Sequence, residues 1–445
     1  AVWLTLHPRT LVTDCLREAT ENLRRQILDD TGARCGLTHV TAEFVLHLAE
    51  ELLADRTRPH LRAAVNATGI ILHTGLGRAV WPECVVDSMV ADLKGYVTLA
   101  VDPASGKRQG RDACIEYLLT ELTGAEAATV VVNNAAATLI ALAALCGGKE
   151  VIVSRGQLIE IGGEFRLPDV MAQSGSKMVE VGATNRTHLR DYERAISPET
   201  AAIFRAHPSN YRIVGFTEEV PIDQLATLAH ARGLLTIDDL GAGALVGLER
   251  FGLPHEPMVG ESIAAGADVV LFSADKLIGA SQGGIIVGKK DCIDRIRRHP
   301  LARALRVDKS CLMALERTLA LFRDPERLVR EHPTYRMLAT PPVELEARAG
   351  RLVAALAQAA PAVLAETIEG VGYLGSGSLP MHALPSVLVA VAAPGLTADQ
   401  LAQRLRTDEA CIFARIERDR VLLDVRTMTD SQLPLVAAAL GRIAR

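Results

Sequence analysis

The sequence predicts an α/β fold with a mainly parallel central sheet, and the pattern of its apolar residues is the reason. Between residues 63 and 318, short apolar runs alternate with stretches whose apolar residues have helical spacing. Most runs are continuously apolar, as expected for strands that helices cover on both faces. The expected strands are residues 129–132, 151–153, 178–181, 201–204, 234–237, 269–272 and 284–287. Because ligands of such sheets bind at the carboxyl ends of the strands, polar residues that follow these runs are candidates for a site.

Two further regions flank this large α/β domain. Residues 1–62 have apolar residues at helical spacing in two stretches, separated by a break at residues 32–36, and they predict an N-terminal helical module. Residues 319–445 begin with a proline-rich segment up to residue 345, which predicts a linker. The rest of this region predicts a C-terminal small α+β domain, with helices at 343–359 and 397–406, a strand at 386–392, a hairpin at 412–416 and 421–425, and a terminal helix.

The composition excludes several classes of protein. The chain has 445 residues and a formal net charge of −5, so only a local patch could bind nucleic acid. None of its eight cysteines has C-x-x-C or zinc-site spacing, which predicts buried free thiols in a reducing cytosol and no metal site. The apolar run at residues 3–6 is too short for a signal peptide, and no run is long enough to span a membrane. We therefore expect a cytoplasmic protein with no membrane partner.

Two residues at strand ends suggest a cofactor. Asp239 follows the strand expected at 234–237, and Lys276 follows the strand expected at 269–272. A pyridoxal phosphate (PLP) enzyme needs such a pair, since the amine forms a Schiff base and the carboxylate keeps the pyridine nitrogen protonated. The alternative is an ordinary surface lysine and an ordinary strand-end aspartate, and these two residues alone do not decide between the interpretations.

A run of small residues, Asn134-Ala135-Ala136, comes where the strand at 129–132 turns into a helix. Small residues there let backbone N–H groups of the helix N-terminus approach a phosphate, which the helix dipole also favours. Ser273, three residues before the lysine, could add a hydroxyl to the same group. Small helix starts are common, however, and Ser273 could instead be a helix N-cap.

Two loops could supply further contacts to the cofactor. Gln157 lies in the loop after the strand at 151–153, where a side chain can pack on the cofactor ring or simply belong to a polar turn. Ser209, in the segment His207-Pro208-Ser209, could present a hydroxyl to the cofactor. A lone histidine at a strand end, such as His207, more often has a structural than a catalytic role.

Arginines provide a candidate site for an oxyanion. Arg303 and Arg306 are three residues apart, which on a helix places both side chains on one face. Their two guanidinium groups could hold one tetrahedral oxyanion, and Arg78 could be a third ligand. The alternative is surface arginines that pair with carboxylates.

Motifs from about residue 60 onward resemble one family, in order along the chain. The longest are IEIGG at residues 159–163 and GATNRT at residues 182–187. Others lie at residues 65–74, 133–137, 165–171, 209–217, 272–276, 284–290, 303–309 and 374–380. On these motifs the chain resembles the bacterial selenocysteine synthases, the L-seryl-tRNA(Sec) selenium transferase family. It departs from the family pattern at Gly75 for the usual Asn, Gln157 for Glu, Ala242 for Ser, Ala274 for Gly, and Ala280-Ser281 for Gly-Pro.

This resemblance implies a fold-type-I PLP-dependent transferase. Lys276 matches the lysine that carries PLP, and Asp239 matches the partner of the pyridine nitrogen. The family's arginines that bind the selenium donor, selenophosphate, are matched by Arg78, Arg303 and Arg306.

The resemblance also implies partners. Residues 1–62 match the family's tRNA-binding module, and they are shorter than usual, so we expect an incomplete module. The family forms homo-oligomers, so a decamer built from five dimers is expected, with active sites between subunits.

The implied reaction is a β-replacement on seryl-tRNA(Sec). Water is eliminated from the serine with the freed Lys276 as base, and selenium then adds to the dehydroalanyl-tRNA to give selenocysteinyl-tRNA(Sec). One alternative is a PLP-dependent lyase acting on a small amino acid or amino sugar, in which Arg426 could bind a substrate carboxylate or form a structural ion pair. Another is a non-catalytic tRNA-binding relative, against which the intact Lys276 and Asp239 argue.

Overall fold

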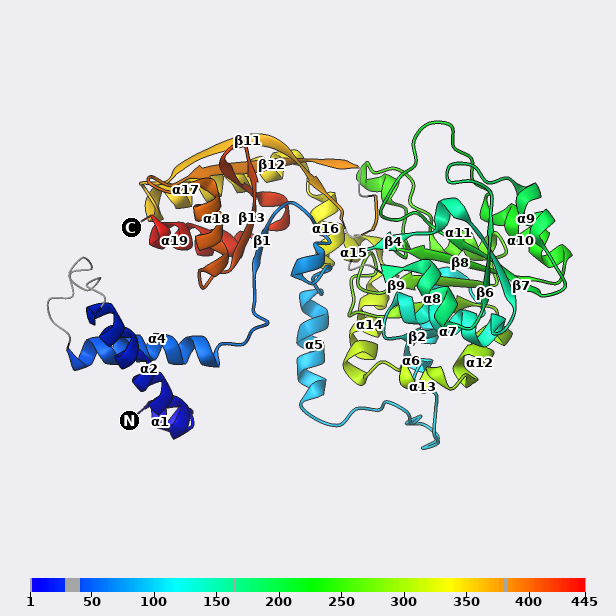
Figure 1. The fold of residues 1–445 in the computed structure, drawn as a ribbon, viewed down its shortest axis with the longest axis horizontal. Coiled ribbons are helices and arrows are strands. Elements are labelled where there is room, and N and C mark those ends of the chain that lie inside the picture. Colours follow the sequence, from blue (N-terminus) through cyan, green and yellow to red (C-terminus); the bar gives the residue numbers. More distant parts are fainter. Residues whose placement is uncertain (1, 29–40, 163–164, 376, 380–381, 445) are drawn as a thin grey trace. The chain divides into compact units, whose positions relative to one another are not determined.

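The described part of the chain divides into two compact units. The computed structural model describes residues 2–28, 41–162, 165–375, 377–379 and 382–444 (Figure 1). The units are Ala1–Ala63 and Ala64–Arg445.

The first unit is helical. Its described part contains α1 (Trp3–Leu6), α2 (Arg9–Leu28) and α4 (Ala42–Thr57). Helices α2 and α4 pack through the buried residues Val12, Cys15 and Leu53. These helices lie where the apolar spacing predicts them, whereas the expected break at residues 32–36 lies outside the described residues.

The second unit contains a seven-stranded sheet with the strand order β2-β10-β9-β8-β7-β3-β6. Its strands are β2 (Ala127–Val131), β3 (Glu150–Ser154), β6 (Lys177–Val181), β7 (Thr200–Ala206), β8 (Leu235–Gly241), β9 (Val269–Ser273) and β10 (Gly284–Gly288). From β9 to β6 all neighbours are parallel, whereas β10 is antiparallel to both β9 and β2. The sheet is therefore mainly parallel, as predicted, and every strand expected for it is present.

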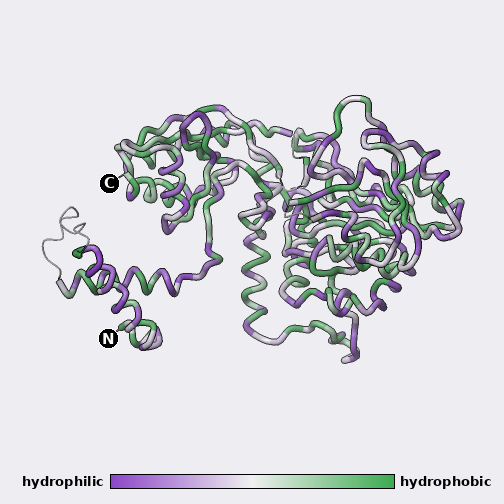
Figure 2. Tube along the Cα trace, viewed as in Figure 1, coloured by the Kyte–Doolittle hydropathy of each residue, from purple (hydrophilic) through white to green (hydrophobic). Residues whose placement is uncertain are grey.

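Helices cover both faces of this sheet, which explains the continuous apolar runs (Figures 1 and 2). In β9, Val270 and Phe272 belong to the hydrophobic core on one face, and Leu271 belongs to the core on the other. The first core includes residues of α6 (Ala113–Thr123), α11 (Val259–Ala264) and α14 (Lys309–Leu321), and the second includes residues of α7 (Asn134–Cys146), α8 (Leu167–Gln173) and α12 (Lys290–Arg298). Other helices of this part are α5 (Glu83–Leu93), α9 (Leu189–Ala195) and α10 (Ile222–Ala231). Burial of each large apolar side chain stabilises the fold by roughly 1.5–3 kcal/mol.

A smaller sheet of five strands has the order β1-β13-β14-β12-β11. Its strands are β1 (Val65–Ala67), β11 (Leu364–Tyr373), β12 (Ala383–Ala392), β13 (Ile412–Glu417) and β14 (Arg420–Asp424). Residues of α17 (Pro342–Ala359), α18 (Ala398–Thr407) and α19 (Leu433–Ile443) form a core with it. The expected C-terminal helices and hairpin are thus present, together with two strands that the sequence pattern did not predict, β1 and β11.

The segment expected to be a linker is partly helical. It contains the end of α14, then α15 (Pro325–Glu331) and α16 (Pro333–Ala339). Each of these two short helices has a proline in its first turn, where the missing N–H group costs no hydrogen bond. The prolines therefore start helices here, and the expected connecting segment contains two short helices.

The sequence predicts neither a membrane-spanning segment nor a metal site. Among these residues, no helix is long and apolar enough to cross a membrane. The cysteines that the structure describes are all free, and within the same residues no cluster of His, Cys, Asp or Glu could hold a metal ion.

Helix α7 starts directly against the antiparallel strand of the main sheet. A Cβ atom at Gly284 of β10 would lie 2.1 Å from the carbonyl oxygen of Asn133 and 2.9 Å from the backbone nitrogen of Asn134. Backbone atoms cannot yield as a flexible side chain would, so only glycine permits this close approach of helix and strand.

Gly284→Ala is expected to lower the free energy of unfolding by about 2 kcal/mol, because the new methyl group overpacks the contact with α7. Gly350→Ala is the matched control. Gly350 lies within α17 with nothing within 4 Å of an added Cβ, so alanine should stabilise the protein by roughly 0.5–1 kcal/mol. Urea unfolding followed by circular dichroism measures both, and equal midpoints for Gly284→Ala and the unchanged protein would contradict the expectation.

Candidate active site

Asp239 and Lys276 lie at one edge of the main sheet, where neighbouring parallel strands end. Asp239 is near the end of β8, and Lys276 is the third residue after β9. Both line a cavity of about 230 Å³. Other residues that line it include Arg78, Asn134, Ala135, Ser209 and Ser273. The sheet therefore brings these side chains together from distant parts of the sequence, as the carboxyl edge of parallel strands does in general.

Asp239 is a half-buried residue whose carboxylate is fixed in place by hydrogen bonds. Asn134 Nδ2 donates to its Oδ1 at 2.8 Å, and Thr138 Oγ1 donates to its Oδ2 at 3.0 Å. The N–H of Gly241 donates to Oδ1 at 3.1 Å. Burial raises the pKa of Asp239, and the hydrogen bonds and the nearby Lys276 oppose this effect. A cation that binds in the cavity would therefore favour the ionised carboxylate.

Lys276 is buried, with 6% of the residue exposed. Burial is the main cause that lowers the pKa of its amine, and this favours the neutral form, which is the nucleophile. The turn after Lys276 is anchored from helix α16, because the Tyr335 hydroxyl donates to the carbonyl oxygen of Leu277 at 2.9 Å. The next carbonyl group, of Ile278, lies 2.9 Å from His332 Nε2. The lysine is thus presented by a turn that buried side chains hold from behind.

The N-terminus of α7 faces the same cavity. Asn133 caps the helix, and its Oδ1 accepts a hydrogen bond from the N–H of Ala136 at 2.9 Å. Ala136 therefore serves the cap, whereas Asn134 and Ala135 line the cavity. The first N–H groups of a helix have no intrahelical acceptor, and with the helix dipole they favour an anion at this position.

Ser273 is the last residue of β9 and lies on the cavity wall. Residues 274–277 after it form a turn, not a helix. The alternative interpretation of Ser273 as a helix N-cap is therefore wrong, and its side chain is placed beside the cavity that Lys276 lines.

Arg78 reaches this cavity from a distant part of the chain. Its Nη1 lies 2.7 Å from Oδ2 of Asp275, the residue before the lysine. The φ angle of Arg78 is +63°, in the left-handed region that residues other than glycine rarely adopt. Such backbone strain is concentrated at functional sites. No sequence motif singles out Asp275, since only the fold shows that it pairs with Arg78.

Arg303 and Arg306 lie elsewhere in the unit. Helix α13 (Leu301–Ala304) ends before Arg306, so the prediction that one helix face carries both arginines is wrong. The chain leaves the helix because the carbonyl oxygen of Leu305 accepts a hydrogen bond from the N–H of Val132, which joins this segment to the end of β2. Both arginines line a separate cavity of about 700 Å³. It also contains Arg108, Arg111 and Arg297.

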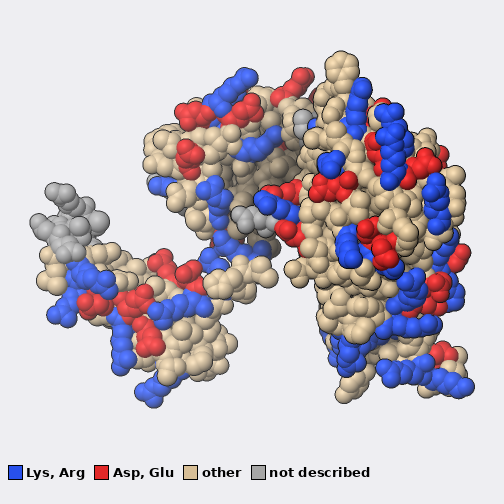
Figure 3. All heavy atoms as spheres, turned by 45° about the vertical axis from the view of Figure 1, so that its right-hand side comes forward, with Lys and Arg blue, Asp and Glu red and all other residues tan. Residues whose placement is uncertain are grey.

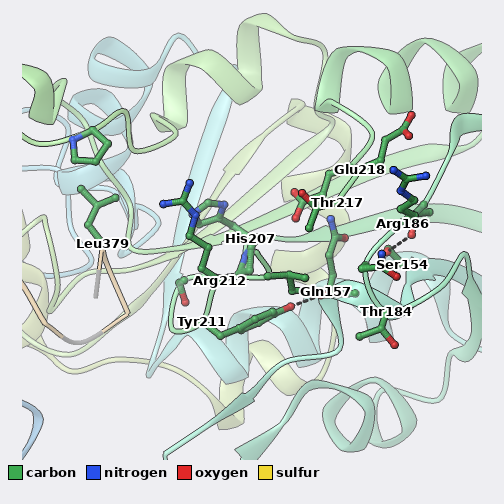
Figure 4. Close-up of a pocket in the computed structure, with 18 of the residues that line it drawn as sticks. Ser154, Gln157, Thr184, Arg186, His207, Tyr211, Arg212, Thr217, Glu218 and Leu379 are labelled. Carbon is green, nitrogen blue, oxygen red and sulfur yellow. Dashed lines mark hydrogen bonds between the residues drawn. The ribbon is translucent and has the colours of Figure 1, made fainter. Parts of the chain in front are cut away.

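Figure 4 shows a further cavity, of about 460 Å³. It adjoins the cavity of Lys276, because His207 and Ser209 line both cavities. Gln157 lines this second cavity rather than the first. Its side chain is fixed, because Oε1 accepts a hydrogen bond from the N–H of Ala206 at 3.3 Å. Within one copy of the chain, Gln157 therefore lies beside the lysine's cavity and not on its wall.

Glu256 is a buried acidic residue that the sequence analysis missed. It is 2% exposed, lines the second cavity, and has its Oε1 3.9 Å from His207 Nε2. Burial raises the pKa of Glu256 to about 7, against the opposing effect of Lys276. Burial also lowers the pKa of His207 to about 4, so this ring is neutral at neutral pH. No motif marks Glu256, since it lies in a loop between Pro254 and Pro257 and not at a strand end.

Comparison with known proteins identifies the family of the chain. The family model of L-seryl-tRNA selenium transferase matches residues 64–429. The chain belongs to this family. The L-seryl-tRNA(Sec) selenium transferase of Nitratidesulfovibrio vulgaris is 46% identical over 433 residues, which cover 97% of this chain and 91% of that protein. The protein of the same name from Geobacter sulfurreducens is 44% identical, with 98% of this chain and 94% of that protein covered.

A solved structure supports the fold. D-Glucosaminate-6-phosphate ammonia-lyase aligns with a TM-score of 0.59 at 22% sequence identity, covering 86% of this chain and 96% of that chain. The predicted fold-type-I architecture is thus confirmed.

As a member of this family the chain is a PLP-dependent enzyme, and the cavity fits that cofactor. It offers an amine at Lys276, an anionic wall at Asp239 and N–H donors at the start of α7, which match the aldehyde, the pyridine nitrogen and the phosphate of PLP. Asn134 Oδ1 is buried and has no hydrogen-bond partner within the described residues, so it remains an acceptor for a ligand.

The raised pKa of Glu256 predicts a pH-dependent stability. A carboxyl group with a pKa of about 7 in the folded state and an ordinary value near 4.5 when unfolded binds more protons in the folded state between these pH values. The free energy of unfolding should therefore fall as pH rises from 4.5 to 7, by on the order of 3 kcal/mol from this group. Glu256→Gln should remove that contribution, so urea unfolding at pH 5 and pH 8 should show a smaller difference than in the unchanged protein. An identical pH dependence in both proteins would contradict the expectation.

Proposed function

We propose that the chain converts seryl-tRNA(Sec) to selenocysteinyl-tRNA(Sec), using selenophosphate as the selenium donor. The observation that carries the proposal is that Lys276 and Asp239 share a cavity with the N-terminus of α7 in a chain of this family. Elimination of water from the serine precedes the addition of selenium. We place the reaction in the cytoplasm, where charged tRNA is used.

Each residue of the cavity has a part in this proposal. Lys276 would hold PLP covalently through its amine, and it removes the α-proton of the serine, for which its lowered pKa suits it. Asp239 would keep the pyridine nitrogen protonated, and the N–H groups of Asn134 and Ala135, with the Ser273 hydroxyl, would hold the phosphate. Ser209, from the loop after β7, lines the same cavity as Lys276. When bound, PLP stabilises the negative charge that develops at the α-carbon.

We propose that the arginines hold the phosphate part of selenophosphate and that two copies of the chain complete one site. Arg78 lies beside Lys276 in the same copy, whereas Arg303 and Arg306 line a different cavity of that copy. Planar guanidinium groups suit a tetrahedral oxyanion. Arginines that lie away from the lysine of their own chain can serve the lysine of a second chain. This fits a homo-oligomer, for which we propose a decamer of five dimers.

We propose that the first unit, Ala1–Ala63, binds the tRNA. Basic and acidic side chains are interspersed over the face shown in Figure 3, and the whole chain has a net charge of −5. Recognition therefore depends on local groups and on the shape of the RNA rather than on a uniform basic field.

The position of Arg426 argues against its proposed role in the alternative function, that of a PLP-dependent lyase. Arg426 is buried, and its guanidinium group donates to the carbonyl oxygens of Met337 at 2.6 Å and Thr340 at 3.3 Å. These contacts hold it inside the fold, so it is not presented to a substrate carboxylate. These contacts are structural, but they are hydrogen bonds to carbonyl groups and not the expected ion pair.

Lys276→Ala should abolish covalent trapping of PLP by borohydride, because among the described residues it is the lysine that lines the cavity of Asp239. Lys290→Ala is the matched control, since Lys290 is an exposed lysine 3.4 Å from Asp294 and should leave trapping unchanged. Mass spectrometry of the reduced protein provides the measurement. A labelled peptide that persists in Lys276→Ala would show that another residue carries the cofactor.

A mixing experiment tests whether two copies share a site. Lys276→Ala and Arg303→Ala chains should each fail to transfer selenium. Coexpressed in equal amounts they should recover about a quarter of the normal activity, because half of the dimers are mixed and one of their two sites is intact. If no activity returns although mixed oligomers are isolated through two different affinity tags, the arginine serves the lysine of its own chain or has another role.

A further inference from the structure

The proposed elimination needs two proton transfers. The α-carbon of the serine loses a proton, and the β-hydroxyl group gains one so that it leaves as water. Lys276 accounts for the first transfer. The residue that performs the second transfer has to be inferred, and this inference rests on the proposed function.

Glu256 is a buried acidic residue that could donate the proton for the second transfer. It lines the cavity that adjoins the cavity of Lys276, and only 2% of it is exposed. His207, 3.9 Å away, lines both cavities, so Glu256 lies where the two meet. A general acid needs a carboxyl group that is protected from water and lies close to the reacting atoms.

The backbone at residues 377 and 378 lies close to both Lys276 and Glu256. A Cβ atom at Gly377 would lie 3.1 Å from Lys276 Nζ and 3.2 Å from Ser209 Oγ, so the segment runs directly past the amine. The next residue, Ser378, is fully buried and is near enough to Glu256 to affect its ionisation. Glu256 and Lys276 thus flank one piece of chain, and each influences the charge of the other.

The surroundings of Glu256 favour its protonated form more than water does. Burial raises its pKa to about 7, whereas Lys276 and His255 oppose this rise. His207 supplies no positive charge at neutral pH, because burial and then Arg205 lower its pKa to about 4. A large share of Glu256 is therefore protonated near neutral pH, and the group can regain its proton after each turnover.

Of the other carboxylates around the two cavities, Glu219 is exposed, and three are engaged by partners. Asp239 accepts three hydrogen bonds. Asp275 pairs with Arg78 at 2.7 Å, and Glu218 lies 3.0 Å from His188 Nδ1. We propose that Glu256 is the acid that protonates the leaving hydroxyl group of the serine.

The step balances in protons and electrons. Lys276 takes the α-proton, and the electron pair of that bond forms the double bond between the α- and β-carbons. The bond from the β-carbon to oxygen breaks with its electron pair on oxygen, which receives the Glu256 proton and leaves as water. The ammonium of Lys276 and the carboxylate of Glu256 remain, and transfer of one proton between them restores both groups.

The test separates the two transfers in the holoenzyme. Seryl-tRNA(Sec) with deuterium at the α-carbon reports α-proton removal by loss of deuterium, and dehydroalanyl-tRNA reports loss of water, both by mass spectrometry. Glu256→Gln should keep deuterium exchange while water loss falls about 10²–10³-fold. Glu219→Gln, an exposed carboxylate in the same cavity, should behave as the unchanged enzyme. Normal water loss in Glu256→Gln, or an equal fall of both rates, overturns the proposal.

A changed leaving group gives a second test. Chloride leaves without a proton, so Glu256→Gln should release chloride from β-chloroalanyl-tRNA at nearly the rate of the unchanged enzyme. A fall as large as that for water would show that Glu256 has a positioning role only, and the proposal would be wrong.

A third measurement requires no tRNA. The visible absorbance of bound PLP should show a titration near pH 7 that is absent in Glu256→Gln and present in Glu219→Gln. A titration that persists in Glu256→Gln overturns the placement of this acid beside the cofactor. If the unchanged enzyme forms no dehydroalanyl-tRNA, the proposed function fails, while this titration still tests Glu256. Should the glutamine variant not fold, Glu256→Asp should keep water loss with a shifted pH profile, and an unshifted profile counts against the proposal.

Discussion

The partial removal of the Asp239 carboxylate from water is the constraint on which the rest of the site depends. Removal of a carboxylate from water costs several kcal/mol unless hydrogen bonds and a cation compensate. Asn134 and Thr138, from the first turns of α7, and Gly241, after the aspartate on β8, supply the hydrogen bonds. Helix, strand and carboxylate therefore fix one another. The contact also requires the helix start to lie against the sheet, which Gly284 permits.

The parts of this site that could be predicted from the sequence are those set by local chain direction. Strands buried on both faces read as continuous apolar runs, so the ends of β8 and β9, and with them Asp239 and Lys276, could be located without a structure. The same reasoning placed Asn134 at a helix start. In each case the functional residue lies within a few residues of the end of a strand or the start of a helix.

What could not be predicted depends on contacts between distant segments. The helix that contains Arg303 ends before Arg306, because the segment of Arg306 pairs with the end of β2. No local sequence pattern indicates this contact. Glu256 lies in a loop without a motif, and only the fold shows that it is buried. Strand β11 was missed because most of its residues are partly or fully exposed, so it lacks the apolar signal of a core strand.

Strand β1 has a consequence for the order in which the chain can fold during synthesis. Val65 pairs with Ile412, so the start of the second unit binds a strand near the end of the sequence. Every strand of the seven-stranded sheet lies between these two positions and can pair before β13 has left the ribosome. The smaller sheet, by contrast, cannot be completed until β13 has been made. Pairing of β1 with β13 closes the long loop between them, and the entropic cost of this closure is offset only when the sheet is fully packed. The larger sheet can thus be assembled first, and the smaller sheet is completed only when almost the whole chain has been made.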